Sequence, residues 1–213
     1  MFGAMKVVML TGLILVTAAC TPPGNARRAG LDGPLRDEYV QIVSVDRRGV
    51  EVDASGQIVR ALAPDGMCIP TDSVQTSPLS VFLLMRDCSE GVERFGGVLS
   101  LSISNGPTPG GLDGLAAFMT TEAGLLSLGH GGDLEDMTLI DVRTEKGAVF
   151  AVVEDRSEFG PAFAGDTICR AFVELNGRMT VVSLLSLREA PQSADVLRDR
   201  LGEVVEALHQ SNV

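Results

Sequence analysis

The residues of this 213-residue chain best suited to chemistry are two histidines and four cysteines. A cysteine nucleophile needs a base within hydrogen-bond reach, and His130, in a glycine-rich stretch, is the candidate base for Cys169. The alternative is that Cys169, between two residues of a strand-like run, is a buried and inert thiol. The sequence therefore allows an envelope hydrolase with a Ser or Cys nucleophile, but it assigns no catalytic residue.

Known metal and phosphate motifs are absent from the sequence. Gly131 to Asp136 holds three carboxylates without the Asp-x-Asp-x-Asp-Gly spacing of a calcium loop, which favours a solvated turn. The glycines from Pro107 to Gly114 lack the Lys and Ser/Thr of a phosphate loop, and no Gly-x-Ser-x-Gly elbow occurs. We expect no metal and no cofactor.

The charge balance disfavours one class of partner. Lys and Arg sum to 17 against 28 Asp and Glu, a net charge of −11. Such an excess of carboxylates repels phosphate backbones, so we expect no nucleic-acid partner.

The first twenty residues predict export and lipidation. Lys6 precedes the apolar run from Val7 to Val16, which is short for a membrane span of about 20 residues but fits the core of a signal peptide. The following Thr17-Ala18-Ala19-Cys20 resembles the lipobox of bacterial lipoproteins, which implies a lipid on Cys20 and attachment to the membrane through it. The alternative is an ordinary secretory signal with Cys20 incidental.

This interpretation divides the chain into three parts: a lipoprotein signal peptide (1–19), a lipidated Cys with a flexible tether (20–37), and a single α+β periplasmic domain (38–213). Thr21 stands where an Asp would resemble an inner-membrane retention signal. By that analogy we expect the protein at the outer membrane, facing the periplasm.

Short β-branched runs and turn residues predict an antiparallel sheet. The expected strands are Tyr39 to Val45, Gly49 to Val52, Gln57 to Leu62, Val81 to Met85 and Gly97 to Ser104, followed by a four-stranded meander of Thr138 to Arg143, Ala148 to Glu154, Thr167 to Leu175 and Arg178 to Leu187.

Two amphipathic helices are expected to pack against this sheet. The first is a single helix with an apolar stripe from Leu112 to Leu126 and Asp113 as its cap. The second is capped by Ser193 and has an apolar face of Val196, Leu197, Leu201, Val204, Val205 and Leu208.

This order of elements resembles the PsbP-like fold over roughly Val81 to Leu208, and the Asn176-Gly177 hairpin before the terminal helix is its best-matched part. The resemblance is one of topology and transfers no functional residue. It implies a non-enzymatic binding or assembly-support module. Met67-Cys68-Ile69 and Arg86-Asp87-Cys88 also look similar to segments of alphaproteobacterial envelope lipoproteins.

Two further features, a cysteine pair and a loop with two phenylalanines, are candidates for a disulfide and for a partner contact. Cys68 and Cys88 lie at the ends of neighbouring strand-like runs, so we predict a disulfide between them. The loop from Asp155 to Asp166 carries Phe159 and Phe163. These rings either contact an envelope protein partner or bury beneath the sheet as a core plug.

Replacing Cys20 tests the predicted anchor. Cys20→Ala should abolish lipidation and either leave the precursor or release a soluble protein, because no other segment is expected to hold the chain on a membrane. Membrane fractionation after metabolic labelling with a fatty acid measures both effects. Mature variant protein that remains embedded in the membrane would place the anchor elsewhere.

Overall fold

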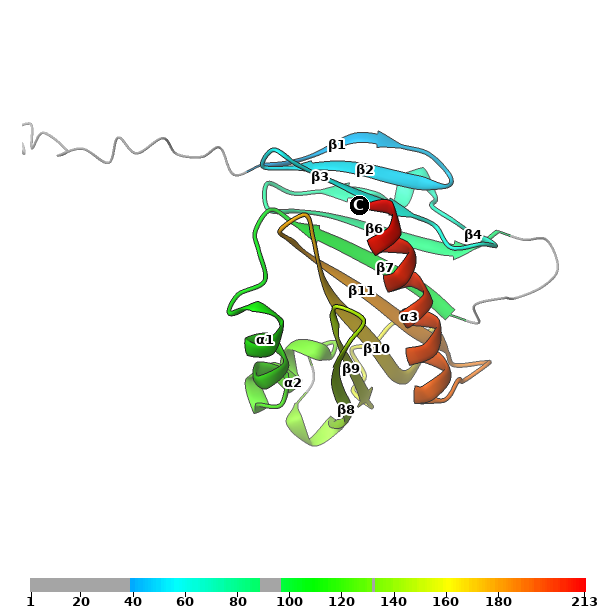
Figure 1. Ribbon diagram of the computed structural model, residues 1–213. Helices are drawn as coiled ribbons and strands as arrows, with labels where there is room; N and C mark the ends of the chain where they lie inside the picture. Colours follow the sequence, from blue (N-terminus) through cyan, green and yellow to red (C-terminus); the bar gives the residue numbers. More distant parts are fainter. Residues whose placement is uncertain (1–38, 89–96, 132) are drawn as a thin grey trace, which may run out of the picture. The chain divides into compact units, whose positions relative to one another are not determined.

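The computed structural model describes residues 39–88, 97–131 and 133–213 (Figure 1). The predicted signal peptide, Cys20 and the predicted tether therefore lie outside the described residues. Within the described part, no helix is long and apolar enough to cross a membrane.

Two antiparallel sheets form the α+β fold that the sequence predicts. The smaller sheet consists of β1 (Val40–Val45), β2 (Gly49–Ala54) and β3 (Gln57–Leu62). The main sheet runs in the order β4 (Met67–Cys68), β6 (Ser80–Asp87), β7 (Gly97–Ser104), β11 (Arg178–Leu187), β10 (Ala164–Leu175), β9 (Ala148–Asp155) and β8 (Met137–Glu145), and β5 (Gln75–Thr76) pairs with β6.

Tight turns join β8 to β9 and β10 to β11 in the meander. Asn176 and Gly177 both have positive φ, 49° and 71°, as a two-residue hairpin turn of type I′ requires. Lys146 and Gly147 repeat this geometry at 51° and 71°, and β8 continues to Glu145, two residues beyond the strand end expected at Arg143. The four-stranded meander predicted from the sequence is confirmed.

The C-terminal helix α3 (Ala194–Ser211) covers one face of the main sheet against β9, β10 and β11 (Figure 1). Ser193 caps it as predicted, accepting a hydrogen bond from the backbone N–H of Val196 at 3.4 Å. Most of its predicted apolar face is buried, but Val196 is 41% exposed and does not belong to that face. The buried residues are Leu197, Leu201, Val204, Val205 and Leu208.

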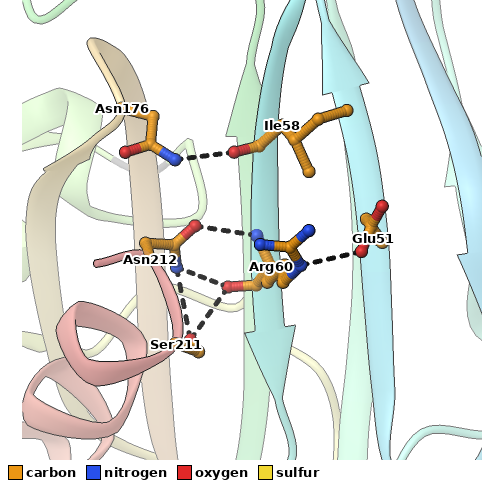
Figure 2. A network of polar contacts seen from close by, with 6 residues as sticks. All are labelled: Glu51, Ile58, Arg60, Asn176, Ser211 and Asn212. Carbon is orange, nitrogen blue, oxygen red and sulfur yellow. Dashed lines mark hydrogen bonds and ion pairs between the residues drawn. The ribbon is translucent and has the colours of Figure 1, made fainter.

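The smaller sheet covers the same face beside α3, where β1 and β2 contact β6 and β7 and where α3 contacts β3. A polar network joins β3 to the end of α3 and to the β10–β11 turn (Figure 2). The Asn212 side chain accepts from Arg60 N at 2.9 Å and donates to Arg60 O at 2.7 Å. Asn176 donates to the carbonyl of Ile58 at 2.7 Å. Backbone groups at the edge of β3 thus find partners on the main body.

The opposite face of the main sheet is covered at one end by two short helices, α1 (Gly111–Met119) and α2 (Glu122–Leu128), which contact β8 and β9. The prediction of one continuous helix was wrong, because Thr121 caps a new helix by accepting from Gly124 N at 3.1 Å. Asp113 is not the cap of α1, which begins after Gly110 with no side-chain cap. The break turns Leu128 toward the sheet and leaves Leu126 exposed.

The short η1 (Thr71–Ser73), η2 (Leu134–Asp136), β4 and β5 were not anticipated.

The close approach of α1 and α2 predicts opposite effects of two Gly→Ala substitutions. At Gly124 a Cβ would lie 2.0 Å from Phe118 O and 2.7 Å from the Met119 Cα, so Gly124→Ala should lower the free energy of unfolding by about 1–3 kcal/mol. At the exposed Gly114 the nearest atom is 3.9 Å away, so Gly114→Ala should raise it by about 0.5–1 kcal/mol. Urea denaturation of both variants measures the difference, and equal effects would contradict the tight packing at Gly124.

Candidate binding site on the open face of the sheet

The second face of the main sheet is open where α1 and α2 end. Strands β6, β7, β11 and β10 form the floor of a cavity of about 540 Å³, which we call the trough, with His130, Pro161 and Phe163 among its lining residues. This volume lies in the range of about 300–1,000 Å³ that is typical of small-molecule sites.

Cross-strand register places a polar row in the middle of the trough. Leu84 on β6 pairs with Ser100 on β7, Ser100 pairs with Ser183 on β11, and Ser183 pairs with Arg170 on β10. Side chains directly opposite one another in a sheet share a face. The hydroxyls of Ser100 and Ser183 therefore lie between the side chain of Leu84 and the guanidinium of Arg170.

Larger apolar side chains flank this polar row. On one side Phe82, Val181 and Phe172 lie in one cross-strand row, with Ser102 between Phe82 and Val181. On the other side Val98 pairs with Leu185. The serines are small and the neighbouring side chains are large, so the middle of the face is hollow.

A second hollow of about 390 Å³ continues the trough toward the edge of the sheet. Leu84, Val98 and Phe163 line both cavities, and Pro70 and Asp72 are among the residues that line only the second. The open face therefore offers an elongated surface across several strands.

Arg170 is the charged residue of the trough floor, between Ile168 and Phe172 on the same face of β10. Burial lowers the pKa of its guanidinium, and the charge of Asp155 acts in the opposite direction. Its Nε is buried and has no hydrogen-bond partner among the described residues. An arginine stays charged at physiological pH, so the trough contains a positive charge that is partly withdrawn from water.

His130 lines the trough, and the carboxylate of Asp155 contacts both its backbone N–H and its ring. Asp155 Oδ2 accepts from the backbone N–H of His130 at 2.7 Å and lies 2.9 Å from His130 Nδ1. The backbone N–H of Ser157 donates to the other oxygen, Oδ1, at 2.9 Å. Gly129 permits this approach, because a Cβ there would lie 2.9 Å from Asp155 Oδ2.

These contacts keep Asp155 ionised although its side chain is fully buried. Burial by itself would raise the pKa of Asp155, but hydrogen bonds from Ser157 and His130 outweigh it and lower the pKa to about 2. The arrangement fixes the His130 ring beside the trough.

Cys169 does not share a site with His130. It belongs to the core on the α3 face of β10, whereas the trough lies on the opposite face. Burial raises the pKa of the Cys169 thiol to about 12. The structure therefore supports the inert thiol and contradicts a Cys169–His130 couple.

Cys68 and Cys88 lie close together as free thiols at the end of β4 and β6. Cys68 pairs with Arg86, and the backbone N–H of Cys88 donates to Gly66 O at 3.0 Å. A hydrogen bond with the Cys68 thiol raises the pKa of Cys88. The neighbouring strand ends agree with the expectation, and the disulfide itself stays a prediction.

The loop phenylalanines are not a core plug, because Phe159 is 71% and Phe163 52% exposed. Phe163 lines the trough, and Phe159 is not among the lining residues. A contact of these rings with a partner stays a prediction.

The trough itself was not anticipated from the sequence. Alternation of large apolar residues with serine from Leu99 to Ser104 is the signal that could have indicated a half-covered strand.

No family model matches this sequence, and no curated protein matches it. Among solved structures, the solution structure of cyanobacterial PsbP (CyanoP) from Synechocystis sp. PCC 6803 is similar with a TM-score of 0.34 and 17% identity, covering 86% of this chain and 96% of that chain. A likeness this weak carries no argument for the function of this chain.

Asp155 should make stability depend on acid pH. Its pKa falls from 3.8 to about 2 on folding, so its stabilisation of the fold is complete above about pH 5 and is lost as the pH falls through 2. The pKa difference corresponds to about 2 kcal/mol. Asp155→Asn should remove this part of the pH dependence of urea unfolding, whereas Asp133→Asn at an exposed position should retain it. Parallel pH profiles for the wild type and Asp155→Asn would contradict the role of this carboxylate.

Proposed function

We propose that this chain is a lipid-anchored lipoprotein of the bacterial envelope whose folded domain is a non-enzymatic binding module that takes an apolar ligand in the trough. The observation that carries this proposal is the hollow, uncovered half of the main sheet between β6 and β10. Large exposed apolar surfaces on soluble domains commonly mark binding sites. Leu84, which is exposed, and Phe82 and Val98, which are half-buried, contribute apolar surface to the trough.

The anchor and the location rest on the sequence. The lipobox-like Thr17-Ala18-Ala19-Cys20 supports lipidation of Cys20, and residues 20–37 have the composition of a tether. We place the domain in the periplasm at the outer membrane, because Thr21 replaces the Asp expected of a retained lipoprotein. The membrane is then a partner through the N-terminal lipid.

An envelope protein is the second partner in this proposal. Phe159 is a large exposed aromatic side chain on the loop after β9, and exposed aromatic residues are enriched where proteins contact one another. A contact there would let the domain support an assembly while the trough holds its ligand. The net charge of −11 disfavours a nucleic acid in either role.

The second candidate function is an envelope hydrolase that uses a serine. One observation favours it: the His130 ring, oriented by Asp155, lines the same trough as Ser100, Ser102 and Ser183. Among the described residues, however, His130 bonds to Asp155 and to none of these hydroxyls. His130→Ala separates the functions, because it removes a general base but leaves the apolar lining of the trough in place.

Photolabelling tests the proposed function with the full lipidated chain in its own membranes. The probe is a neutral alkyl alcohol that carries a photoreactive diazirine, and mass spectrometry maps the labelled peptides. We expect labels on β7, β10 and β11. Ser183→Leu adds an apolar side chain in the middle of the trough and should reduce this labelling about tenfold.

The matched control is Ser44→Leu, which makes the same change at an exposed position of β1. It should leave the labelling of the trough unchanged, and the thermal midpoint of each variant shows whether the fold is intact. Labels spread over the whole surface, with no decrease in the folded Ser183→Leu variant, would show that the trough is not a binding site.

A further inference from the structure

We infer that the ligand of the trough is an amphiphile with one carboxylate, a free medium- or long-chain carboxylic acid, and that Arg170 binds its carboxylate. This inference rests on the proposed function and adds the chemical class of the ligand and the residue that recognises it. It follows from three features: the partners that Arg170 lacks, the charges around it, and the shape of the surface beside it.

Arg170 is placed where a structural arginine would be costly. It lies between Ile168 and Phe172 on an apolar face of β10, and its Nε is buried without an acceptor among the described residues. A guanidinium that is partly withdrawn from water and whose buried Nε lacks an acceptor is unfavourable, and an apolar residue would pack there at lower cost. An anion from outside the chain would supply the missing acceptor.

No acceptor for Arg170 comes from the charged groups described around the trough. Asp155 acts on it through its charge, but its oxygens already accept from His130 and Ser157. His130 also lines the trough, and its ring nitrogen Nδ1 is hydrogen-bonded to Asp155. The carboxylate and the guanidinium thus lie in the same region without a hydrogen bond between them.

The polar row matches a single carboxylate. A guanidinium donates two parallel hydrogen bonds to a carboxylate, and the hydroxyl of Ser183 lies beside Arg170 in the same cross-strand row. The trough floor contributes one permanent positive charge, and the whole chain has a net charge of −11. Multiply charged ligands such as nucleotides would be repelled, whereas one carboxylate is neutralised by Arg170.

The apolar surface beside Arg170 matches an alkyl chain. From β10 the trough crosses β11 and β7 to Leu84 on β6, a span of about 14 Å at three strand spacings. Beyond Leu84 and Phe163 the second hollow continues the trough, with the charged Asp72 and Arg86 also in its lining. An alkyl chain that starts at Arg170 would lie across the strands in the hollow over Ser183 and Ser100, between the apolar side chains that flank these serines, with its carboxylate at Arg170.

Two photoreactive probes with the same alkyl chain test this inference in membranes that contain the full lipidated protein. One probe is a carboxylic acid and the other is the corresponding alcohol. We expect the acid to label the trough about tenfold more efficiently than the alcohol, and unlabelled decanoic acid to compete with it. Arg170→Gln should reduce labelling by the acid to the level of the alcohol and leave labelling by the alcohol unchanged.

Two further variants keep the result interpretable. Arg143→Gln makes the same change at an exposed arginine of β8 and should have no effect on either probe. Arg170→Lys retains the charge without the planar guanidinium and should restore part of the preference for the acid. The thermal midpoint of each variant confirms that it folds.

The outcomes separate the inference from the proposed function. If both probes label the trough equally and Arg170→Gln changes neither, the carboxylate inference is wrong while the binding function stands. If an alkyl phosphate with the same chain displaces the acid more strongly than decanoic acid does, the ligand class is wrong. If neither probe labels the trough, the proposed function itself is wrong.

Discussion

The main sheet carries apolar side chains on both faces, and each face must be shielded from water. On β10, Cys169 and Ala171 point to one face and Ile168 and Phe172 to the other. Apolar burial is the dominant favourable term in folding, so the covering elements decide which parts of the sheet are core. The helix α3 and the small sheet cover the first face, whereas α1 and α2 cover only one end of the second (Figure 1).

The same alternation that builds the core also creates the trough. On β7, Leu99, Leu101 and Ile103 face the covered side and are fully buried. The residues between them, Ser100 and Ser102, face the part of the opposite face that α1 and α2 leave uncovered. Serine tolerates contact with water and occupies little volume, so these positions leave a hollow among larger neighbours. The candidate site is therefore a consequence of how the sheet is covered rather than of a separate loop or insertion.

Local patterns predicted the fold well where a few neighbouring residues determine the structure. The Asn176-Gly177 turn and the Ser193 cap are examples, because turn geometry and capping depend on short sequences. The break at Thr121 was missed, since a continuous apolar stripe hid a second capped start. The trough could not be predicted, because its floor joins Leu84 to Arg170 through a register that only the folded sheet defines.

Of two opposite charges near the trough, Asp155 has hydrogen-bond partners within the fold, whereas the buried Nε of Arg170 has none among the described residues. Asp155 is buried with three hydrogen bonds, which hold its charge in place and orient His130. Arg170 receives no such support from the described residues, although its Nε is buried as well. A fold selected for stability alone would join these two groups or replace the arginine with an apolar residue. Because the carboxylate is satisfied internally, the guanidinium remains free to bind an anion that enters the trough.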